Sequence, residues 1–341
     1  MEKVSVIMPV HNLENYIDDA LISLKKQTYY NYELIVIDDG STDKSASIIQ
    51  NYANHDSRIK LTETNNLGPS AARKLGIELA QGDYLTFLDG DDFVSENWIK
   101  KLVSNIEEHD ADMSVIGYSL FFEKSNKSVS MSSSDNMFVS SGTSILAEWI
   151  SAKTFEGVLW DKMFRRNLFD NIEINTNIFY MEDIELINKI ISKVNKLVYE
   201  GIPLYMYRQR KDSAVHSKFK YNNFSSFNII KEMVYMSRDN SYLRQLAYTR
   251  LAKEMISLFR KMSKKDTITY KNKVNSILSE LKTANDRGEI KLKNIINSIL
   301  FNLMILTRHV FIFSRIQGLF ISTRNLVWQI KRVKLVGNKK I

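Results

Sequence analysis

Short apolar runs alternate with amphipathic stretches over the first ninety residues, and this alternation constrains the fold more than any other feature of the chain. A strand–helix–strand rhythm is typical of a parallel sheet with helices packed on its faces. We therefore expect an α/β domain with a Rossmann-like mixed sheet and helices on both faces. The expected strands are 4–9, 33–37, 59–61 and 84–88, and the expected helices are 16–24, 48–53 and one that begins near Ser70.

The pattern changes after about residue 221. Beyond this point Gly and Pro become rare, and 241–262 and 271–281 have helical periodicity. A length of 341 residues also favours two domains. We expect an α/β catalytic domain at 1–220 and a helical domain with a basic tail at 221–341. Between 95 and 220 the expected elements are helices at 95–109, 143–152, 158–168 and 183–193, strands at 113–117 and 204–207, and a polar loop or hairpin at 123–135.

The chain contains no cysteine, which excludes disulfide bonds, cysteine-ligated zinc and thiol catalysis. Its N-terminal apolar run is interrupted by Pro9 and His11 and precedes no small-residue cleavage site, so we expect no signal peptide. No run of about 18 apolar residues, the length that crosses a bilayer as a helix, occurs. We expect a cytoplasmic protein, or one bound peripherally at the inner face of the cell membrane.

Positive charge is concentrated at the C-terminus, where 291–341 contains ten Lys and Arg residues and no Asp or Glu. Because the whole chain carries +8 and this tail +10, the residues before it carry −2. A nucleic-acid-binding protein would spread basic charge over its body, so we expect no nucleic-acid partner. Two interpretations of the tail stay open. It forms core helices that pack on the catalytic domain, or it lies on an anionic membrane surface.

Carboxylates follow the expected strand 84–88 directly. Asp89 and Asp91 stand one residue apart around a glycine, so both can address one small volume, where their repulsion is costly unless a cation relieves it. Ligation by oxygen alone favours Mg²⁺ or Mn²⁺. The alternative is a tight turn that also caps the next helix.

A second acidic segment, 38–43, follows the expected strand 33–37. A carboxylate here could accept hydrogen bonds from a ribose hydroxyl or a base imide, whereas the alternative is a capped loop with Asp43 as the capping residue. The sequence has neither G-x-G-x-x-G after the first strand nor G-x-x-x-x-G-K-[ST]. Dinucleotide-binding and P-loop functions therefore lose their main support.

Six segments of the chain, taken together and in order, resemble family 2 glycosyltransferases. They are VSVIMPVHN, QTYYNYELIVIDDGSTD, NNLGPSAARKLG, GDYLTFLDGDD, LWDKMFRR and MEDIEL. The resemblance covers about 4–216. It implies the GT-A fold, a nucleotide-diphosphate sugar donor that is most often UDP-linked, Mn²⁺ or Mg²⁺ as cofactor, and inversion of the anomeric configuration. It implies a glycan or lipid-linked acceptor in surface glycan biosynthesis.

The resemblance also implies roles for residues near the N-terminus. Pro9, Val10 and Asp39 resemble the nucleoside pocket, with Asp39 facing uracil, and Asn12 belongs to the same donor-binding group. Arg73 resembles the basic residue near the donor nucleotide, and its alternative is a surface arginine on an amphipathic helix.

Further along the chain, Asp89 resembles the residue that contacts the ribose or the donor sugar, and Asp91 resembles the metal ligand. Asp183 resembles the general base that deprotonates the acceptor hydroxyl, with Glu182 beside it on the acceptor side. The alternative for this acidic pair is compensation of charge at a helix N-terminus. Trp160 resembles an acceptor-side tryptophan, but a buried tryptophan is an equal alternative.

The segment that begins at Tyr207 resembles one that closes over the donor diphosphate in some relatives. Arg210 is assigned there to donor binding, and His216 to the metal shell or to phosphate, with an ordinary surface histidine as its alternative. The chain lacks the Q-x-x-R-W motif and the membrane helices of the processive members. We therefore expect one sugar to be added per encounter.

Two other functions stay open on the residues alone. A sugar nucleotidyltransferase shares the acidic metal site but would need a Gly-rich basic loop, and 9–15 is neither. A non-catalytic scaffold subunit that binds sugar nucleotides is the other, although Asp39, Asp89, Asp91 and Asp183 are all present. An oligomeric state is left open as well.

Overall fold

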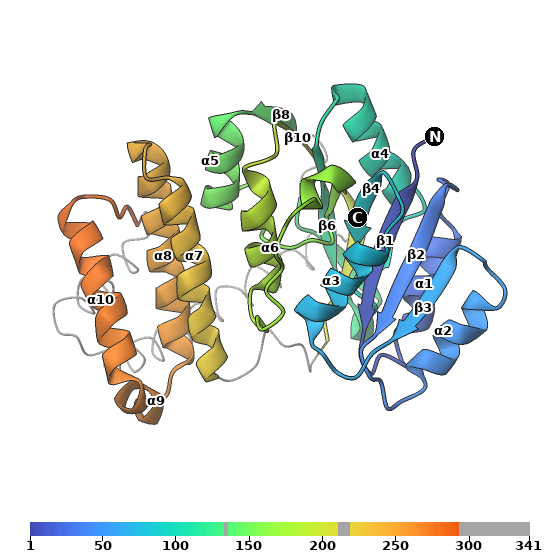
Figure 1. Cartoon of the computed structure of the whole chain (residues 1–341), viewed down its shortest axis with the longest axis horizontal. Coiled ribbons are helices and arrows are strands. Elements are labelled where there is room, and N and C mark those ends of the chain that lie inside the picture. Colours follow the sequence, from blue (N-terminus) through green and yellow to red (C-terminus); the bar gives the residue numbers. More distant parts are fainter. Residues whose placement is uncertain (133–135, 211–218, 293–341) are drawn as a thin grey trace, which may run out of the picture. The chain divides into compact units, whose positions relative to one another are not determined.

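The computed structural model describes residues 1–132, 136–210 and 219–292. It divides the chain into two compact units, Met1–His216 and Ser217–Ile341. The first is a mixed α/β sheet with flanking helices, and in the described part of the second only helices occur (Figure 1). This confirms the expected fold class. The basic tail lies outside the described residues, except for Lys291 and Leu292.

Within the described residues, ten strands form one sheet in the order β3-β2-β1-β4-β9-β6-β10-β5, with β7 beside β6 and β8 beside β10. Because β9 runs antiparallel to both β4 and β6, the strands β1, β2, β3, β4, β6 and β10 all point the same way. Their carboxyl ends therefore meet at one edge of the sheet. The strands are β1 Val4–Val10, β2 Tyr32–Asp38, β3 Ile59–Glu63, β4 Tyr84–Phe87, β5 Phe93–Val94, β6 Met113–Phe122, β7 Lys127–Ser130, β8 Met137–Ser141, β9 Lys162–Arg165 and β10 Lys196–Arg208.

Helices cover both faces of this sheet. Alternate residues of β1, such as Val6 and Met8, lie in one hydrophobic core with apolar residues of α1 and α4. On the opposite face, α3 packs so closely on β1 that a Cβ at Gly76 would lie 2.4 Å from Ile7 Cγ2. Figure 1 shows α3 crossing in front of β1 and β2. The helices of this unit are α1 Ile17–Lys25, α2 Ser45–Ala53, α3 Pro69–Leu79, α4 Trp98–His109, α5 Thr143–Ser151 and α6 Glu182–Ile191.

The helix expected at 158–168 is wrong, because this segment contains β9 followed by a short 3-10 turn at Arg166–Phe169. Its apolar residues have spacings that fit a helix, but Lys162–Arg165 pairs with β4 on one side and with β6 on the other. Hydrogen bonds to two strands outweigh the local helical pattern. The polar segment after β6 begins with a hairpin, in which β7 pairs antiparallel with β6.

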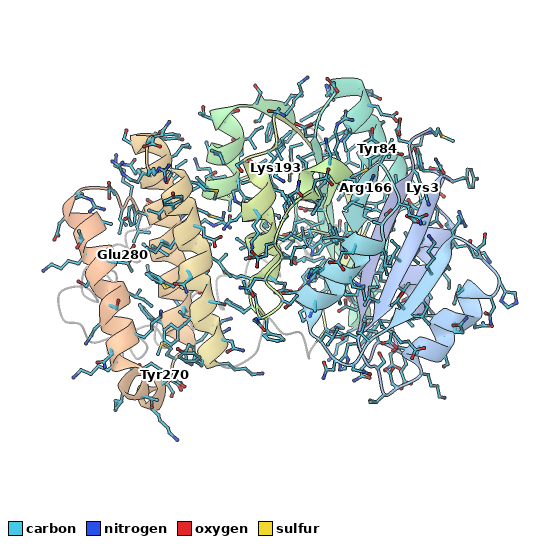
Figure 2. The ribbon with its side chains drawn as sticks, viewed as in Figure 1. Lys3, Tyr84, Arg166, Lys193, Tyr270 and Glu280 are labelled. Carbon is cyan, nitrogen blue, oxygen red and sulfur yellow. The ribbon has the colours of Figure 1, made fainter. Side chains whose placement is uncertain are left out.

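The second unit consists of a 3-10 turn, Tyr221–Phe224, and helices α7 Ser225–Met236, α8 Ser241–Lys261, α9 Lys264–Thr269 and α10 Lys271–Asp286. Tyr270 directly precedes α10 and Glu280 lies within it; both are labelled in Figure 2. Tyr270 packs against Phe224 with ring centroids 5.7 Å apart, and Glu280 accepts a 2.7 Å hydrogen bond from Lys231 on α7. Among the described residues, no helix is both long and apolar enough to cross a membrane.

Candidate active site

The ends of β1 and β2 are tied to each other by side-chain hydrogen bonds. Asn12 has a left-handed φ of 53°, and its side-chain oxygen accepts a 2.8 Å bond from the Thr42 backbone N–H. Ser41 Oγ accepts a 2.9 Å bond from the Asn12 N–H. Val10 is 2% exposed and belongs to the core, whereas Pro9 is half-buried. In this structure Asn12 shapes the loop, and Val10 faces inward.

Asp39, assigned to the nucleoside, is buried and makes three hydrogen bonds. Its Oδ1 accepts from Thr64 Oγ1 at 2.7 Å and from the Leu67 N–H at 2.6 Å, and its Oδ2 accepts from the Gly68 N–H at 2.7 Å. These bonds fasten the loop between β3 and α3 to the end of β2. A carboxylate has about four acceptor positions, so Asp39 keeps capacity for one more donor.

Asp43 stabilises the loop in which it lies, in agreement with the alternative of a capped loop. Its Oδ1 accepts from the Ser45 N–H at 2.9 Å at the start of α2, and its Oδ2 accepts from the Glu14 N–H at 3.0 Å. Asp43 thus joins the start of α2 to the loop after β1.

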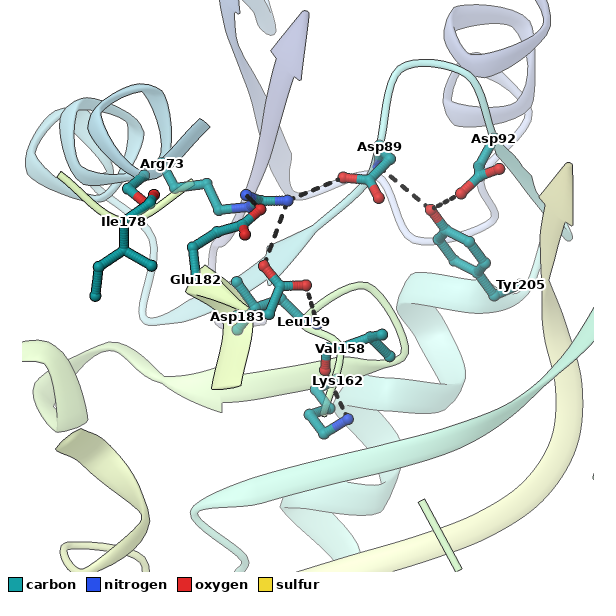
Figure 3. A network of polar contacts seen from close by, with 11 residues as sticks. Arg73, Asp89, Asp92, Val158, Leu159, Lys162, Ile178, Glu182, Asp183 and Tyr205 are labelled. Atoms are coloured by element: carbon teal, nitrogen blue, oxygen red, sulfur yellow. Dashed lines mark hydrogen bonds and ion pairs between the residues drawn. The ribbon is translucent and has the colours of Figure 1, made fainter. Parts of the chain in front are cut away.

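Arg73 lies at the centre of the acidic residues and is buried, so the alternative of a surface arginine is wrong. Its Nη1 donates to Glu182 Oε1 at 3.0 Å, and its Nη2 lies 3.3 Å from Asp89 Oδ1 and 3.4 Å from Asp183 Oδ1 (Figure 3). Three elements therefore meet at one guanidinium group: helix α3, the turn after β4, and the first turn of α6.

Burial and charge act on these carboxyls together. Burial, with smaller contributions from the charges of Asp91, Asp183 and Glu182, raises the pKa of Asp89 to about 7 against the lowering by Arg73. Burial also raises the pKa of Asp183, against the lowering by Arg73. Such perturbed carboxyls grouped in one place are typical of catalytic and ligand-binding sites. A raised pKa makes Asp183 a stronger base than an exposed aspartate.

Asp91 and Arg210 are brought together, with Arg210 Nε 2.9 Å from Asp91 Oδ2. The Arg210 guanidinium also lies 5.0 Å from the centre of the Tyr16 ring. In the described part of the site, Asp89, Asp91, Glu182 and Asp183 therefore share two cations, Arg73 and Arg210. This excess of negative charge and the oxygen-only donor set fit a divalent Mg²⁺ or Mn²⁺ ion, which one or two carboxylates hold together with substrate phosphate.

His216, assigned to the same metal, lies outside the described residues. Within the described ranges, no group of three His, Asp or Glu residues is arranged to hold a metal ion.

A network around Asp92 holds the acidic turn and was missed from the sequence. The buried Asp92 carboxylate accepts from the Tyr205 hydroxyl at 2.7 Å and from the Arg208 N–H at 2.7 Å. The Tyr205 oxygen in turn accepts from the Asp89 N–H at 3.3 Å, and Arg208 Nε donates to the Asp91 carbonyl at 2.8 Å. The turn is thus anchored to the end of β10. In the sequence, only the third acid of the Asp-Gly-Asp-Asp motif indicated a separate role for Asp92.

Trp160 is buried, so the structure agrees with its core alternative. Its ring is stacked on Tyr205 with centroids 4.3 Å apart and on Tyr207 at 5.7 Å, and Tyr118 contacts it edge-on at 5.0 Å. With these neighbours the indole offers no open face to a sugar ring. It supports the strand that carries Tyr205 instead.

A model of a known family, described as glycosyl transferase family 2, matches residues 5–175. The glycosyltransferase GlyA of Streptococcus pneumoniae is 35% identical over 218 residues, which are 62% of this chain and 31% of that protein. An uncharacterized glycosyltransferase of Haemophilus influenzae is 53% identical over 102 residues, 30% of this chain and 41% of that protein. The chain thus spans only 31% and 41% of the length of these two curated relatives.

Two further similarities are to a teichoic acid biosynthesis protein and to a solved structure. The minor teichoic acid biosynthesis protein GgaB of Bacillus subtilis is 31% identical over 227 residues, 66% of this chain and 25% of that protein. The crystal structure of Staphylococcus aureus TarS residues 1–349 in complex with UDP-GlcNAc matches with a TM-score of 0.67 at 20% identity, over 82% of this chain and 81% of that one. At this identity the structural match shows the fold alone.

Proposed function

Since this chain belongs to glycosyltransferase family 2, we propose that it transfers one sugar from a UDP-sugar to an acceptor hydroxyl, with inversion of the anomeric configuration. Asp183 is the general base. The observation that carries this proposal is the meeting of Asp183, Glu182 and Asp89 at the buried Arg73. Family membership favours sugar transfer over the nucleotidyltransferase alternative.

The donor end of the site lies at the carboxyl ends of β1, β2 and β4, where doubly wound sheets bind ligands. There Asp39 has acceptor capacity left for a base imide, and Asp89 lies close to Asp91. A structure of the similar protein TarS contains UDP-GlcNAc, which supports a uridine nucleotide here. When bound, Mn²⁺ or Mg²⁺ at Asp91 would neutralise the leaving diphosphate. Arg210 would then exchange its contact with Asp91 for one with phosphate.

The acceptor end is organised around Asp183. An ordinary hydroxyl does not ionise at neutral pH, so its attack on the sugar requires a carboxylate within about 3 Å. The side chain of Asp183 is 16% exposed, which leaves it accessible from one side. Arg73 holds one of its oxygens and the Leu159 N–H holds the other at 3.3 Å. Both contacts fix the direction of the carboxylate.

The acceptor is proposed to be a glycan or lipid-linked chain of the cell surface. Support comes from the printed functions of relatives, a teichoic acid biosynthesis protein and a poly(ribitol-phosphate) N-acetylglucosaminyltransferase. The missing Q-x-x-R-W motif supports transfer of a single sugar per encounter.

The base assignment is tested with Asp183→Asn, which keeps the shape of the side chain. We expect this variant to lose at least about a thousandfold in transfer while its affinity for UDP with Mn²⁺ stays within about twofold, because proton removal and nucleotide binding use different residues. Asp110→Asn is the matched control, since Asp110 is exposed at the far end of α4. Full transfer by Asp183→Asn would show that another group is the base.

A further inference from the structure

Lys162, at the start of β9, is a fully buried lysine. A buried charge of this kind needs a structural or functional reason. Its Nζ donates to the Asp161 carboxylate at 2.5 Å and to the backbone carbonyls of Val158 at 2.7 Å and Glu156 at 2.8 Å. An ammonium group has three N–H bonds, and all three have an acceptor here. Lys162 is therefore not available to bind a substrate directly.

A buried ion pair rarely adds stability, because removing both charges from water costs about as much as their attraction returns. Burial raises the pKa of Asp161 to about 6, and burial likewise lowers the pKa of Lys162. An apolar pair would pack there more cheaply. The ammonium group, unlike an apolar side chain, donates hydrogen bonds to two backbone carbonyls, those of Glu156 and Val158.

The segment held in this way contacts the base. Leu159 follows Val158 directly, and its backbone N–H donates to Asp183 Oδ2 at 3.3 Å. Figure 3 shows this path from the Lys162 ammonium through Val158 and Leu159 to the Asp183 carboxylate. The other oxygen of Asp183 faces Arg73 at 3.4 Å. Arg73 on α3 and the Leu159 N–H thus orient the carboxylate together. The Leu159 contact depends on the segment that Lys162 holds.

We propose that Lys162 is a positioning residue for the reaction: it holds the carbonyls of Glu156 and Val158 so that the Leu159 N–H orients Asp183 toward the acceptor hydroxyl. This inference rests on the proposed function, because it takes Asp183 as the base.

The test must separate positioning from folding, because Lys162→Met alone would leave the buried Asp161 without its counter-ion. The comparison is therefore between Asp161→Asn and the double variant Asp161→Asn/Lys162→Met. In Asp161→Asn the Lys162 nitrogen has enough N–H donors for the two carbonyls whether or not it is ionised, and the double variant lacks this nitrogen. The two proteins differ only in the group under test. Both are compared at a temperature where circular dichroism shows them folded.

We expect kcat for transfer to be about tenfold or more lower in the double variant than in Asp161→Asn, since small errors in placing a catalytic group are costly. The Kd for UDP with Mn²⁺ and the KM for the donor should agree within about twofold, because the nucleotide residues lie on other strands. Amide hydrogen exchange at Leu159 should be at least about tenfold faster in the double variant.

An unchanged kcat, or unchanged exchange at Leu159, would overturn the proposal. So would a fall in kcat that is matched by an equal loss of UDP affinity, because that result indicates general disruption. If the wild-type protein transfers no sugar, the proposed function fails, and Leu159 exchange still decides whether Lys162 holds this segment.

Discussion

Gly68 shows how a single residue can join the donor and acceptor ends of the site. Its φ of 91° is one that other residues adopt at a cost, and its N–H donates to Asp39 at 2.7 Å. A Cβ here would lie 2.5 Å from Cε1 of Phe179, which is three residues before Glu182. Backbone angle, hydrogen bond and close contact therefore all require glycine at this position.

Gly68→Ala is expected to lower the free energy of unfolding by about 2–4 kcal/mol, because strain at positive φ adds to the clash with Phe179. Urea unfolding at pH 7 measures the change. Gly142→Ala is the control, since Gly142 also has a positive φ, 57°, but its Cβ would meet nothing within 4 Å. The double variant Gly68→Ala/Phe179→Ala should recover the part that the clash contributes. Equal losses for Gly68→Ala and Gly142→Ala would contradict this account.

Among the residues of the acidic cluster, Arg73 is expected to contribute most to the stability of the fold. Arg73→Met is expected to cost about 2–4 kcal/mol at pH 7, because the carboxylates of Asp89, Glu182 and Asp183 then repel one another without a counter-ion. Chemical unfolding gives the value. Arg238→Met, at a side chain that is 57% exposed, should change stability by less than about 0.5 kcal/mol. An Arg73→Met protein as stable as wild type would refute the role of Arg73 as the central counter-ion.

The residues of the site could be predicted unevenly from the sequence. Carboxylates at strand ends, such as Asp39 and Asp89, were found because apolar strands that stop at acidic residues mark the ligand-binding edge of a parallel sheet. Asp183, in the first turn of α6, was assigned through the family resemblance. The burial of Arg73 was not found, and burial of Trp160 was one of two equal alternatives. Glu182 and Asp183 lie more than a hundred positions from Arg73, and the tyrosines around Trp160 lie more than forty positions from it. Local periodicity carries no information about such partners.

At the scale of secondary structure, Glu33 on β2 connects several neighbouring elements. It is 2% exposed and accepts hydrogen bonds from Lys3 and Lys60 at 2.8 and 2.7 Å, from Ser5 Oγ at 2.7 Å, and from the Gln81 N–H at 2.8 Å. Burial alone would raise the pKa of Glu33, but these donors lower it from 4.5 to about 2. One carboxylate thereby links β1, β3 and the segment before β4 to β2.

Because the pKa of Glu33 is lower in the folded than in the unfolded protein, its contribution to stability is present above about pH 4.5 and is lost as the pH falls toward 2. Glu33→Gln is therefore expected to cost on the order of 2 kcal/mol at pH 7, after allowance for the exposed lysines, and less at each step below pH 4.5. Urea unfolding between pH 7 and 3 measures it. Glu78→Gln, at an exposed helix pair 3.6 Å from Lys74, is the control and should be neutral. A difference that stays constant with pH would contradict the assignment.

Elements were predicted well where a strand is buried along nearly its whole length. β1, β2 and β4 are covered on both faces, so their sequences are mostly apolar. β9 was missed because it is four residues long and contains a buried charge at Lys162. Its identity depends on pairing with β4 and β6, and a local pattern contains no trace of that pairing.

At the scale of the whole molecule, each of the two units has its own buried residues. The hydrophobic core cluster of the sheet extends from Val4 to Tyr205 and uses no residue of the second unit. In the second unit, Leu251, Met255 and Ile277 are buried among helices. From the sequence we expect a division near residue 221, where helical periodicity replaces the strand–helix alternation.

The chain truncated after residue 220 is therefore expected to unfold in one cooperative transition and to bind UDP with Mn²⁺ within about twofold of the full chain. Thermal unfolding and calorimetric titration measure both properties. If the truncated chain does not unfold cooperatively while the full chain does, the α/β unit needs the helices that follow it.

The central claim is that the strand-end carboxylates form the donor site of a metal-dependent glycosyltransferase. The most direct measurement is nucleotide release from a panel of UDP- and GDP-sugars, with Mn²⁺ or EDTA and without acceptor, because slow hydrolysis of the donor needs no acceptor. We expect UDP release from at least one UDP-sugar. The release should be abolished by EDTA, restored by Mn²⁺, and at least about a hundredfold lower in Asp91→Ala. Release that is unaffected by EDTA and by Asp91→Ala, or no release from any donor by the folded protein, would contradict the central claim.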